Sequence, residues 1–213
     1  VAFAMPSLGH EAGEVWLHQF GINPKAGHPL LGMTVFNWGA MNPKFSSQSS
    51  YELACAAAAR YFVEFYSGRV ILFPQVWGPL TSQDDRIPAR RIITHLPDLA
   101  GLVNMVEEPL PAELLKSIYS WMDVFIGTRM HSNIFALSEG VPVIAIGYQQ
   151  KTEGIARMVG VEKWVIDIQQ VQGNELVEKL KELWIERQAW RARIQQVVPN
   201  LIKEANQAGK MVA

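Results

Sequence analysis

The chain has 213 residues, of which 49% are hydrophobic and 18% charged, and its formal net charge is −1. This composition predicts a folded core, in one large domain or in one domain with part of another. The near-neutral charge gives no electrostatic reason to expect nucleic acid or an anionic membrane as a partner, so an anion site would have to be local. No apolar run approaches the roughly 20 residues of a membrane-spanning helix, and the start lacks a signal peptide's basic region.

Cys55 is the only cysteine. It lies in a small-residue run of helical character, where we expect it to be buried and inert. A single cysteine excludes an intramolecular disulfide and a cysteine-rich zinc site. We predict no metal, because the histidines outside one motif lack the spacing of metal ligands, and we expect no cofactor. These histidines are His10, His18, His28 and His95.

The elements follow a regular order along the chain. Residues 1–32 are rich in Gly, Pro and His without a sustained period, and we expect a linker or the remnant of an N-terminal lobe. The predicted strands are 33–38, 69–77 (with a break at Pro74), 101–106, 123–127, 141–147 and 163–168. The predicted helices are 51–68, about 85–97, 110–122, 131–140, 152–160 and 174–206, the last interrupted by Pro199.

This alternation of strands and helices predicts an α/β fold with a doubly wound, mostly parallel sheet. The strands are continuous Val- and Ile-rich runs, which indicates that helices cover both faces of the sheet. We therefore predict a Rossmann-like lobe over residues 33–213 that includes the long terminal helix. The length of this helix, with Trp184 and Trp190, indicates packing across the domain or against a neighbour.

Polar side chains follow four of the predicted strands. Because the carboxyl ends of parallel strands meet at one edge of a sheet, we expect these side chains to converge there, where ligands bind and helix N-termini favour anions. The set comprises Asn37, Trp38, Gln75, Trp77, Asp84, Asp85, Arg86, Thr128, Arg129, His131, Tyr148, Lys151, Thr152 and Glu153.

Three of these side chains suit an anionic ligand that also needs proton transfer. Arg129 can bind a carboxylate or phosphate through two hydrogen bonds, and Lys151 adds a point charge. His131 can donate or accept a proton.

Each residue also has a structural interpretation. His131, next to Ser132, would serve as a helix cap, and Asp84 and Asp85 would form a solvated turn or cap the following helix. Lys151 would be an exposed loop lysine.

The stretch "DVFIGTRMHSNIFALSEGVPVIAIGYQQKTEG" combines an Asp, an apolar run, Arg-Met-His-Ser, an Ala-containing helix, Gly-Val-Pro, a second apolar run and Tyr-x-x-Lys-x-x-Gly. In this combination it resembles the polysaccharide pyruvyl transferase family, with Met130 in place of the usual Leu. The segment "FPQVWGPLTSQDDR" is similar to the family's upstream Pro-Gln…Asp-Asp-Arg segment. The likeness covers about 33–170.

The resemblance implies a two-lobed fold of the glycosyltransferase type GT-B, of which this chain would be mainly the C-terminal lobe. It also implies transfer of pyruvyl from phosphoenolpyruvate, as donor substrate, to a sugar of a cell-surface glycan or glycolipid, with formation of a ketal. Arg129 and His131 would be the catalytic residues: Arg129 would bind the donor's carboxylate or phosphate, and His131 would be the acid/base. The predicted substrate-binding residues are Arg129, Met130, His131, Ser132, Lys151, Tyr148, Glu153, Gln75, Asp85 and Arg86.

Further expectations concern partners and location. We expect a cytoplasmic protein that meets a lipid-linked acceptor at the inner face of the membrane, with no nucleic-acid partner, and the sequence leaves a homo-oligomer open. Two other functions remain open. One is glycosyl transfer from a nucleotide sugar, because the GT-B fold supports both reactions. The other is a non-catalytic interaction module, because residues 1–32 are too few for a first lobe.

Overall fold

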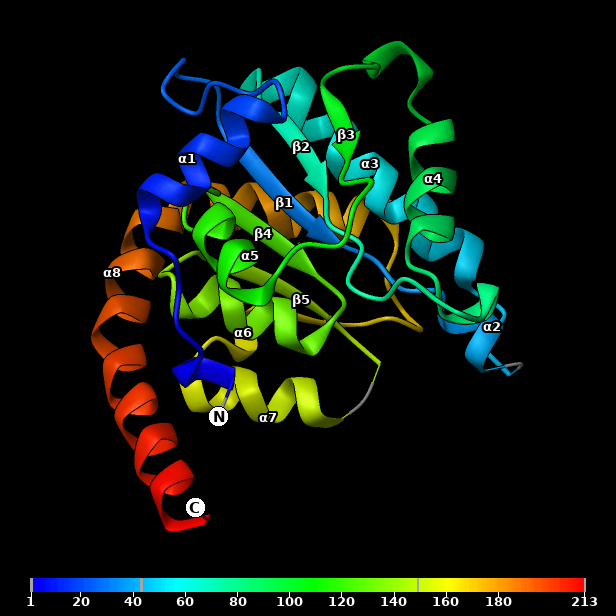
Figure 1. Cartoon of the computed structure of the whole chain (residues 1–213). Helices are drawn as coiled ribbons and strands as arrows, with labels where there is room; N and C mark the ends of the chain where they lie inside the picture. Colours follow the sequence, from blue (N-terminus) through cyan, green and yellow to red (C-terminus); the bar gives the residue numbers. More distant parts are fainter. Residues whose placement is uncertain (1, 43, 149, 213) are drawn as a thin grey trace.

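The computed structural model describes residues 2–42, 44–148 and 150–212, with the side chains of 150, 151 and 208–212 left out. Among these residues, six parallel strands form one sheet in the order β3-β2-β1-β4-β5-β6 (Figure 1). The strands are β1 Leu30–Thr34, β2 Arg69–Leu72, β3 Val103–Met105, β4 Val124–Gly127, β5 Val143–Gly147 and β6 Val165–Asp167. The order runs outward from the β1/β4 pair in both directions, which confirms the predicted doubly wound α/β fold.

Helices lie on both faces of this sheet (Figure 1). The α-helices are α1 His10–Gln19, α2 Trp38–Met41, α3 Gln48–Tyr66, α4 Arg86–Thr94, α5 Ala112–Tyr119, α6 Met130–Ser138, α7 Gln150–Val159 and α8 Gly173–Val212. The described residues also form the short 3₁₀ helices η1 Ala2–Ala4, η2 Thr81–Gln83, η3 Pro97–Leu99 and η4 Glu162–Trp164. Helices α3, α4 and α8 cover one face, and α1, α5, α6 and α7 cover the other. None of the described helices has the combination of length and apolar character needed to cross a lipid bilayer.

The inner strands are buried on both faces. Every residue of β1, β4 and β5 is buried, which explains why their sequences are continuous apolar runs rather than alternating patterns. Cys55 is fully buried on α3, as predicted.

The sequence-based expectation was wrong for the segment before β1. A loop was expected, but His10–Gln19 form α1, which packs on α5 with Gly13 against the backbone of Ser117. Only Gly13 and Leu17 of α1 are buried, so the helix carries too few apolar residues to show a period. Strand β1 also begins at Leu30 rather than at residue 33. The assignment of residues 1–32 to a separate unit remains a prediction.

The expected interruption at Pro199 was also wrong, because α8 continues through it to Val212. Pro199 lies on the exposed side of the helix, where water can satisfy the carbonyl that loses its amide partner. The helix packs across the domain: Trp184 stacks on Tyr66 with ring centroids 4.5 Å apart, and Trp190 meets Trp164 edge to face at 5.7 Å.

Candidate functional site

A cavity of about 350 Å³ lies at the carboxyl ends of the central strands. Its walls come from three strand-to-helix connections: the segment after β2, the β4–α6 junction, and the segment from the end of β5 into α7. The lining residues are Gln75, Val76, Arg129, Met130, His131, Tyr148 and Thr152. The parallel sheet therefore brings together five of the ten predicted substrate-binding residues from distant parts of the chain.

The Arg129 side chain is held from behind by Asp85. The Asp85 carboxylate is fully buried and accepts from both the Nε and an Nη of Arg129, with Nε 3.0 Å away. It also accepts the backbone N–H groups of Gln75 and Val76, each at 3.1 Å. Burial raises the pKa of Asp85, and the Arg129 guanidinium opposes that rise. Asp85 does not line the cavity, so it orients Arg129 instead of meeting a ligand in this structure.

An aromatic ring supports the same guanidinium. The Phe36 ring centroid lies 4.0 Å from the guanidinium carbon of Arg129, which favours the cation. Phe36 is in turn 4.7 Å from Tyr148 and 5.5 Å from Trp38, measured between ring centroids. Trp38 and Tyr148 are themselves 4.9 Å apart. Arg129 is thus fixed on one edge by a carboxylate and on one face by a ring, while 17% of its side chain remains exposed.

His131 is exposed in the first turn of α6 and faces the cavity. The N-cap position of α6 is Arg129, so His131 is not the helix cap. The neighbouring Ser132 is fully buried, donates to the Arg129 carbonyl at 2.6 Å and hydrogen-bonds Thr34 at 2.7 Å. Ser132 therefore stabilises the turn that carries the cavity residues Arg129, Met130 and His131, which is a structural role that the motif did not reveal.

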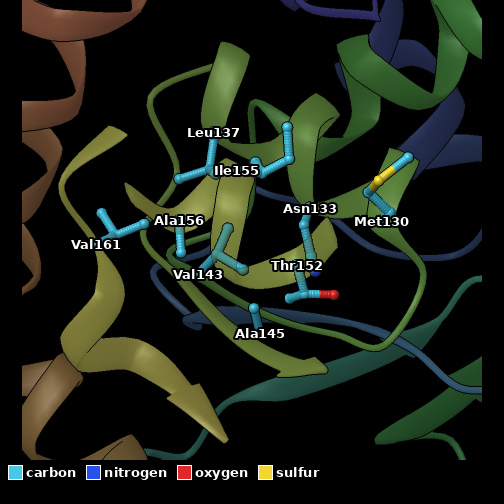
Figure 2. A pocket seen from close by; sticks show the side chains of 9 residues that line it. All are labelled: Met130, Asn133, Leu137, Val143, Ala145, Thr152, Ile155, Ala156 and Val161. Atoms are coloured by element: carbon cyan, nitrogen blue, oxygen red, sulfur yellow. The ribbon is translucent and has the colours of Figure 1, made fainter. Parts of the chain in front are cut away.

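Asn133 was not among the predicted site residues, although it lies in the same turn. Its amide donates to the Gly127 carbonyl at 3.1 Å, while its buried Oδ1 has no hydrogen-bond partner among the described residues. Figure 2 shows Asn133 and Thr152 as the polar members of an otherwise apolar gap between α6, α7 and β5. The gap holds about 10 Å³, room for one water at most. An amide directly before the apolar residues 134–137 was the sequence signal for this position.

Arg86 lies apart from the cavity. It pairs with Asp84 at 2.6 Å and covers the Trp77 ring, with its guanidinium carbon 4.6 Å from the centroid. Asp85 occupies the N-cap position of α4 but makes no capping hydrogen bond with its side chain. The two adjacent aspartates thus hold one arginine each, and only Arg129 reaches the cavity.

The two remaining predicted residues lie on α7. Glu153 is exposed and lines a neighbouring cavity of about 250 Å³, which shares Tyr148 with the first and includes Asp167. The side chain of Lys151 lies outside the described part of the structure. Within the described residues, no group of three or more His, Cys, Asp or Glu side chains is placed to hold a metal ion.

The fold is similar to solved structures of sugar-processing proteins. Escherichia coli ADP-heptose LPS heptosyltransferase II superposes with a TM-score of 0.62 and 11% identity, covering 85% of this chain and 54% of that structure. A putative UDP-N-acetylglucosamine 2-epimerase of Listeria monocytogenes gives 0.54 and 14%, covering 99% and 51%. At such identities the likeness shows the fold, a Rossmann-like lobe of the GT-B type. The chain spans about half the length of these proteins.

One curated relative matches a shorter stretch. The amylovoran biosynthesis protein AmsJ of Erwinia amylovora is 33% identical over 55 residues, which make up 26% of this chain and 13% of AmsJ.

The family model of polysaccharide pyruvyl transferases matches residues 36–150, more than half of the chain. The matched region contains the ring under the guanidinium, the ion pair of Asp85 with Arg129, and His131. By this match, the chain belongs to the polysaccharide pyruvyl transferase family.

Proposed function

We propose that the protein transfers the pyruvyl group of phosphoenolpyruvate to a sugar of a cell-surface glycan or glycolipid, as a step of exopolysaccharide synthesis. The observation that carries this proposal is the pairing of a carboxylate-held Arg129 with His131 in one cavity of a pyruvyl transferase family member. The name of AmsJ, a protein of amylovoran biosynthesis, supports the exopolysaccharide role.

The cavity suits a small donor that carries two anionic groups, a carboxylate and a phosphate. Asp85 takes up one edge of the Arg129 guanidinium, which leaves the second amino group for a carboxylate or phosphate oxygen. A volume of about 350 Å³ is within the range of small-ligand pockets. Lys151, in the first turn of α7, would add a further cation. Met130 and Gln75 would contact the donor, and Ser132 would hold the turn that carries Arg129.

The proposed reaction balances without an added oxidant or reductant. Two C–O bonds form between C2 of the enol phosphate and two hydroxyl oxygens of the sugar, and the C2–O bond to phosphate breaks. One hydroxyl proton ends on C3, which becomes a methyl group, and the other ends on the released phosphate. His131 is the group that moves protons between these positions, and Arg129 offsets the charge of the donor.

The test is phosphoenolpyruvate binding and turnover. Calorimetry measures binding, and phosphate release with a new ketal methyl signal by NMR measures transfer to a panel of acceptor sugars. Arg129→Ala is expected to weaken donor binding, and His131→Ala to lower turnover by about 10²–10⁴-fold with binding retained. The exposed Arg157→Ala and His95→Ala serve as matched controls. No donor binding by the unaltered protein, or full activity in both cavity variants, would refute the proposal.

A second candidate is glycosyl transfer from a nucleotide sugar. It is favoured by the adjoining cavity with Glu153 and by the fold likeness to an E. coli trehalose-6-phosphate structure bound with UDP-2-fluoro glucose (TM-score 0.58, 14% identity, 93% of this chain and 45% of that one). Thermal stabilisation by UDP but not by phosphoenolpyruvate would favour this candidate. If neither ligand binds and the protein forms a stable assembly, a non-catalytic module is the better description.

The cellular location, the contact with a lipid-linked acceptor and the oligomeric state remain predictions. They are a cytoplasmic location at the inner face of the membrane, contact with a lipid-linked acceptor, and a homo-oligomer. Fractionation of cells and light scattering would test them.

A further inference from the structure

We propose that a groove between α1 and the segment after β3 binds a neutral sugar unit of the acceptor glycan, apart from the cavity of Arg129. The groove has a volume of about 310 Å³ and is lined by Trp16, Gln19, Phe20, Met105, Val106, Glu107, Glu108 and Leu110. This inference rests on the proposed function, because it assigns the acceptor of that reaction.

An aromatic platform forms one side of the groove. Trp16 lies on α1, and Phe20, four positions further on, is the C-cap residue with helical backbone angles, so both side chains lie on one face. Their rings stack with centroids 4.6 Å apart and an interplanar angle of 17°, and both side chains are partly exposed. Partly exposed aromatic rings suit the C–H face of a sugar ring, which is apolar.

Polar side chains border this platform. Glu107, Glu108 and Gln19 are exposed, and their oxygens can accept hydrogen bonds from sugar hydroxyls. Glu107 is already paired with Arg90 at 3.0 Å, which offsets part of the negative charge. Rings with hydrogen-bond acceptors and a partly neutralised charge fit a polyhydroxylated neutral ligand better than a cation.

Contacting side chains connect the groove to the Arg129 cavity. Trp16 lies 6.5 Å from Phe73, and Phe73 lies 4.9 Å from Tyr119, between ring centroids. The Tyr119 hydroxyl accepts a hydrogen bond of 3.1 Å from the side chain of Gln75, which lines the cavity. A unit of the acceptor glycan that does not react would supply binding energy in the groove, at a distance from the reacting hydroxyls.

The experiment measures binding of neutral tetrasaccharides of glucose, galactose or mannose by saturation-transfer NMR at millimolar concentration. Trp16→Ala and Glu108→Ala are expected to weaken binding of the preferred tetrasaccharide at least tenfold. Phe65→Ala and Glu175→Ala, on the opposite face, are controls expected to change it less than twofold. Circular dichroism checks folding. Because Glu108 is exposed, its variant tests the groove even where Trp16→Ala fails to fold.

Failure of this inference and failure of the proposed function are distinguishable. Arg129→Ala is expected to lose phosphoenolpyruvate binding while tetrasaccharide binding stays within twofold. Tetrasaccharide binding that depends on Glu108, without any phosphoenolpyruvate binding, supports the groove and refutes pyruvyl transfer. No tetrasaccharide binding, binding unaffected by Glu108→Ala, or binding of a tetralysine peptide in preference to every sugar overturns the groove.

Discussion

The buried Asp85 carboxylate holds the Arg129 guanidinium through both of its oxygens, although the two residues are 44 positions apart in the chain. The same carboxylate accepts two backbone amides of the segment after β2. One side chain therefore joins the β2 and β4 strand ends and fixes the direction of the cavity's arginine.

Replacing Asp85 is expected to destabilise the fold as well as the site. Asp85→Ala leaves the largely buried Arg129 without its partner, and removing one member of a buried ion pair costs about 3–5 kcal/mol. Urea unfolding should show this loss, and calorimetry should show weaker phosphoenolpyruvate binding. Asp84→Ala is the matched control. It breaks the more exposed pair with Arg86 and is expected to cost about 1 kcal/mol or less. Equal losses in the two variants would contradict a buried, orienting role for Asp85.

The raised pKa of Asp85 predicts a pH dependence of stability with a definite sign. Because burial raises this pKa, the folded protein binds a proton on Asp85 at pH values where the unfolded chain has released it. The pH-dependent part of the Asp85 contribution is therefore full below its unfolded pKa and is lost as pH rises through the folded pKa, while the ion pair with Arg129 remains. The unfolding free energy of the unaltered protein minus that of Asp85→Asn should fall as pH rises from about 4. A difference that rises with pH instead would mean that Arg129 keeps this pKa below its ordinary value.

A second polar network, centred on Gln48, is expected to hold the backbone of Phe36, whose ring contacts Arg129. Gln48 donates to the Phe36 carbonyl at 3.0 Å and to Glu52 at 2.6 Å, and it accepts the Gly39 amide at 2.9 Å. Glu52 in turn binds Arg91 through two hydrogen bonds. Gln48→Ala should cost about 1–3 kcal/mol in urea unfolding, because it leaves these groups unsatisfied.

Gln48→Ala should also weaken phosphoenolpyruvate binding, although Gln48 does not line the cavity. Phe36 supports the Arg129 guanidinium, so a loosened Phe36 backbone is expected to weaken phosphoenolpyruvate binding several-fold. Gln170→Ala, at an exposed position, is the control and should alter neither stability nor binding. If Gln48→Ala lowers stability but leaves donor affinity unchanged, the network supports the fold alone.

The end of β4 is expected to tolerate only glycine. A Cβ at Gly127 would overlap the Oδ1 of Asn133 and press on Phe125. Gly127→Ala should therefore cost about 1–3 kcal/mol by overpacking. Gly154→Ala is the opposite case: nothing lies within 4 Å of its Cβ position, and the residue is inside α7. There alanine should stabilise by about 0.5–1 kcal/mol through helix propensity. Thermal unfolding of both variants checks the contrast, and two losses would disprove it.

Much of the fold was predictable because burial leaves a clear pattern. Strands such as Val143–Gly147 are buried on both faces and appear as unbroken apolar runs. Helix α1 was missed because its contact with α5 uses Gly13, where two backbones approach closely, and because Leu17 is its one buried apolar side chain. The continuation of α8 through Pro199 depends on solvent exposure of that side of the helix, which local propensity does not contain.

By itself, the sequence determined the alternation of strands and helices, the parallel sheet that follows from it, and the edge at which Arg129 and His131 would lie. These follow from local periodicity and from the rule that parallel strands end together. Only the tertiary structure decided that Asp85 and Arg129 form one unit, that Arg86 pairs with Asp84 instead of entering the cavity, and that Glu153 borders a separate one. The physical reason is that burial and ion-pair choice depend on distances between segments far apart in the chain, which no local pattern encodes.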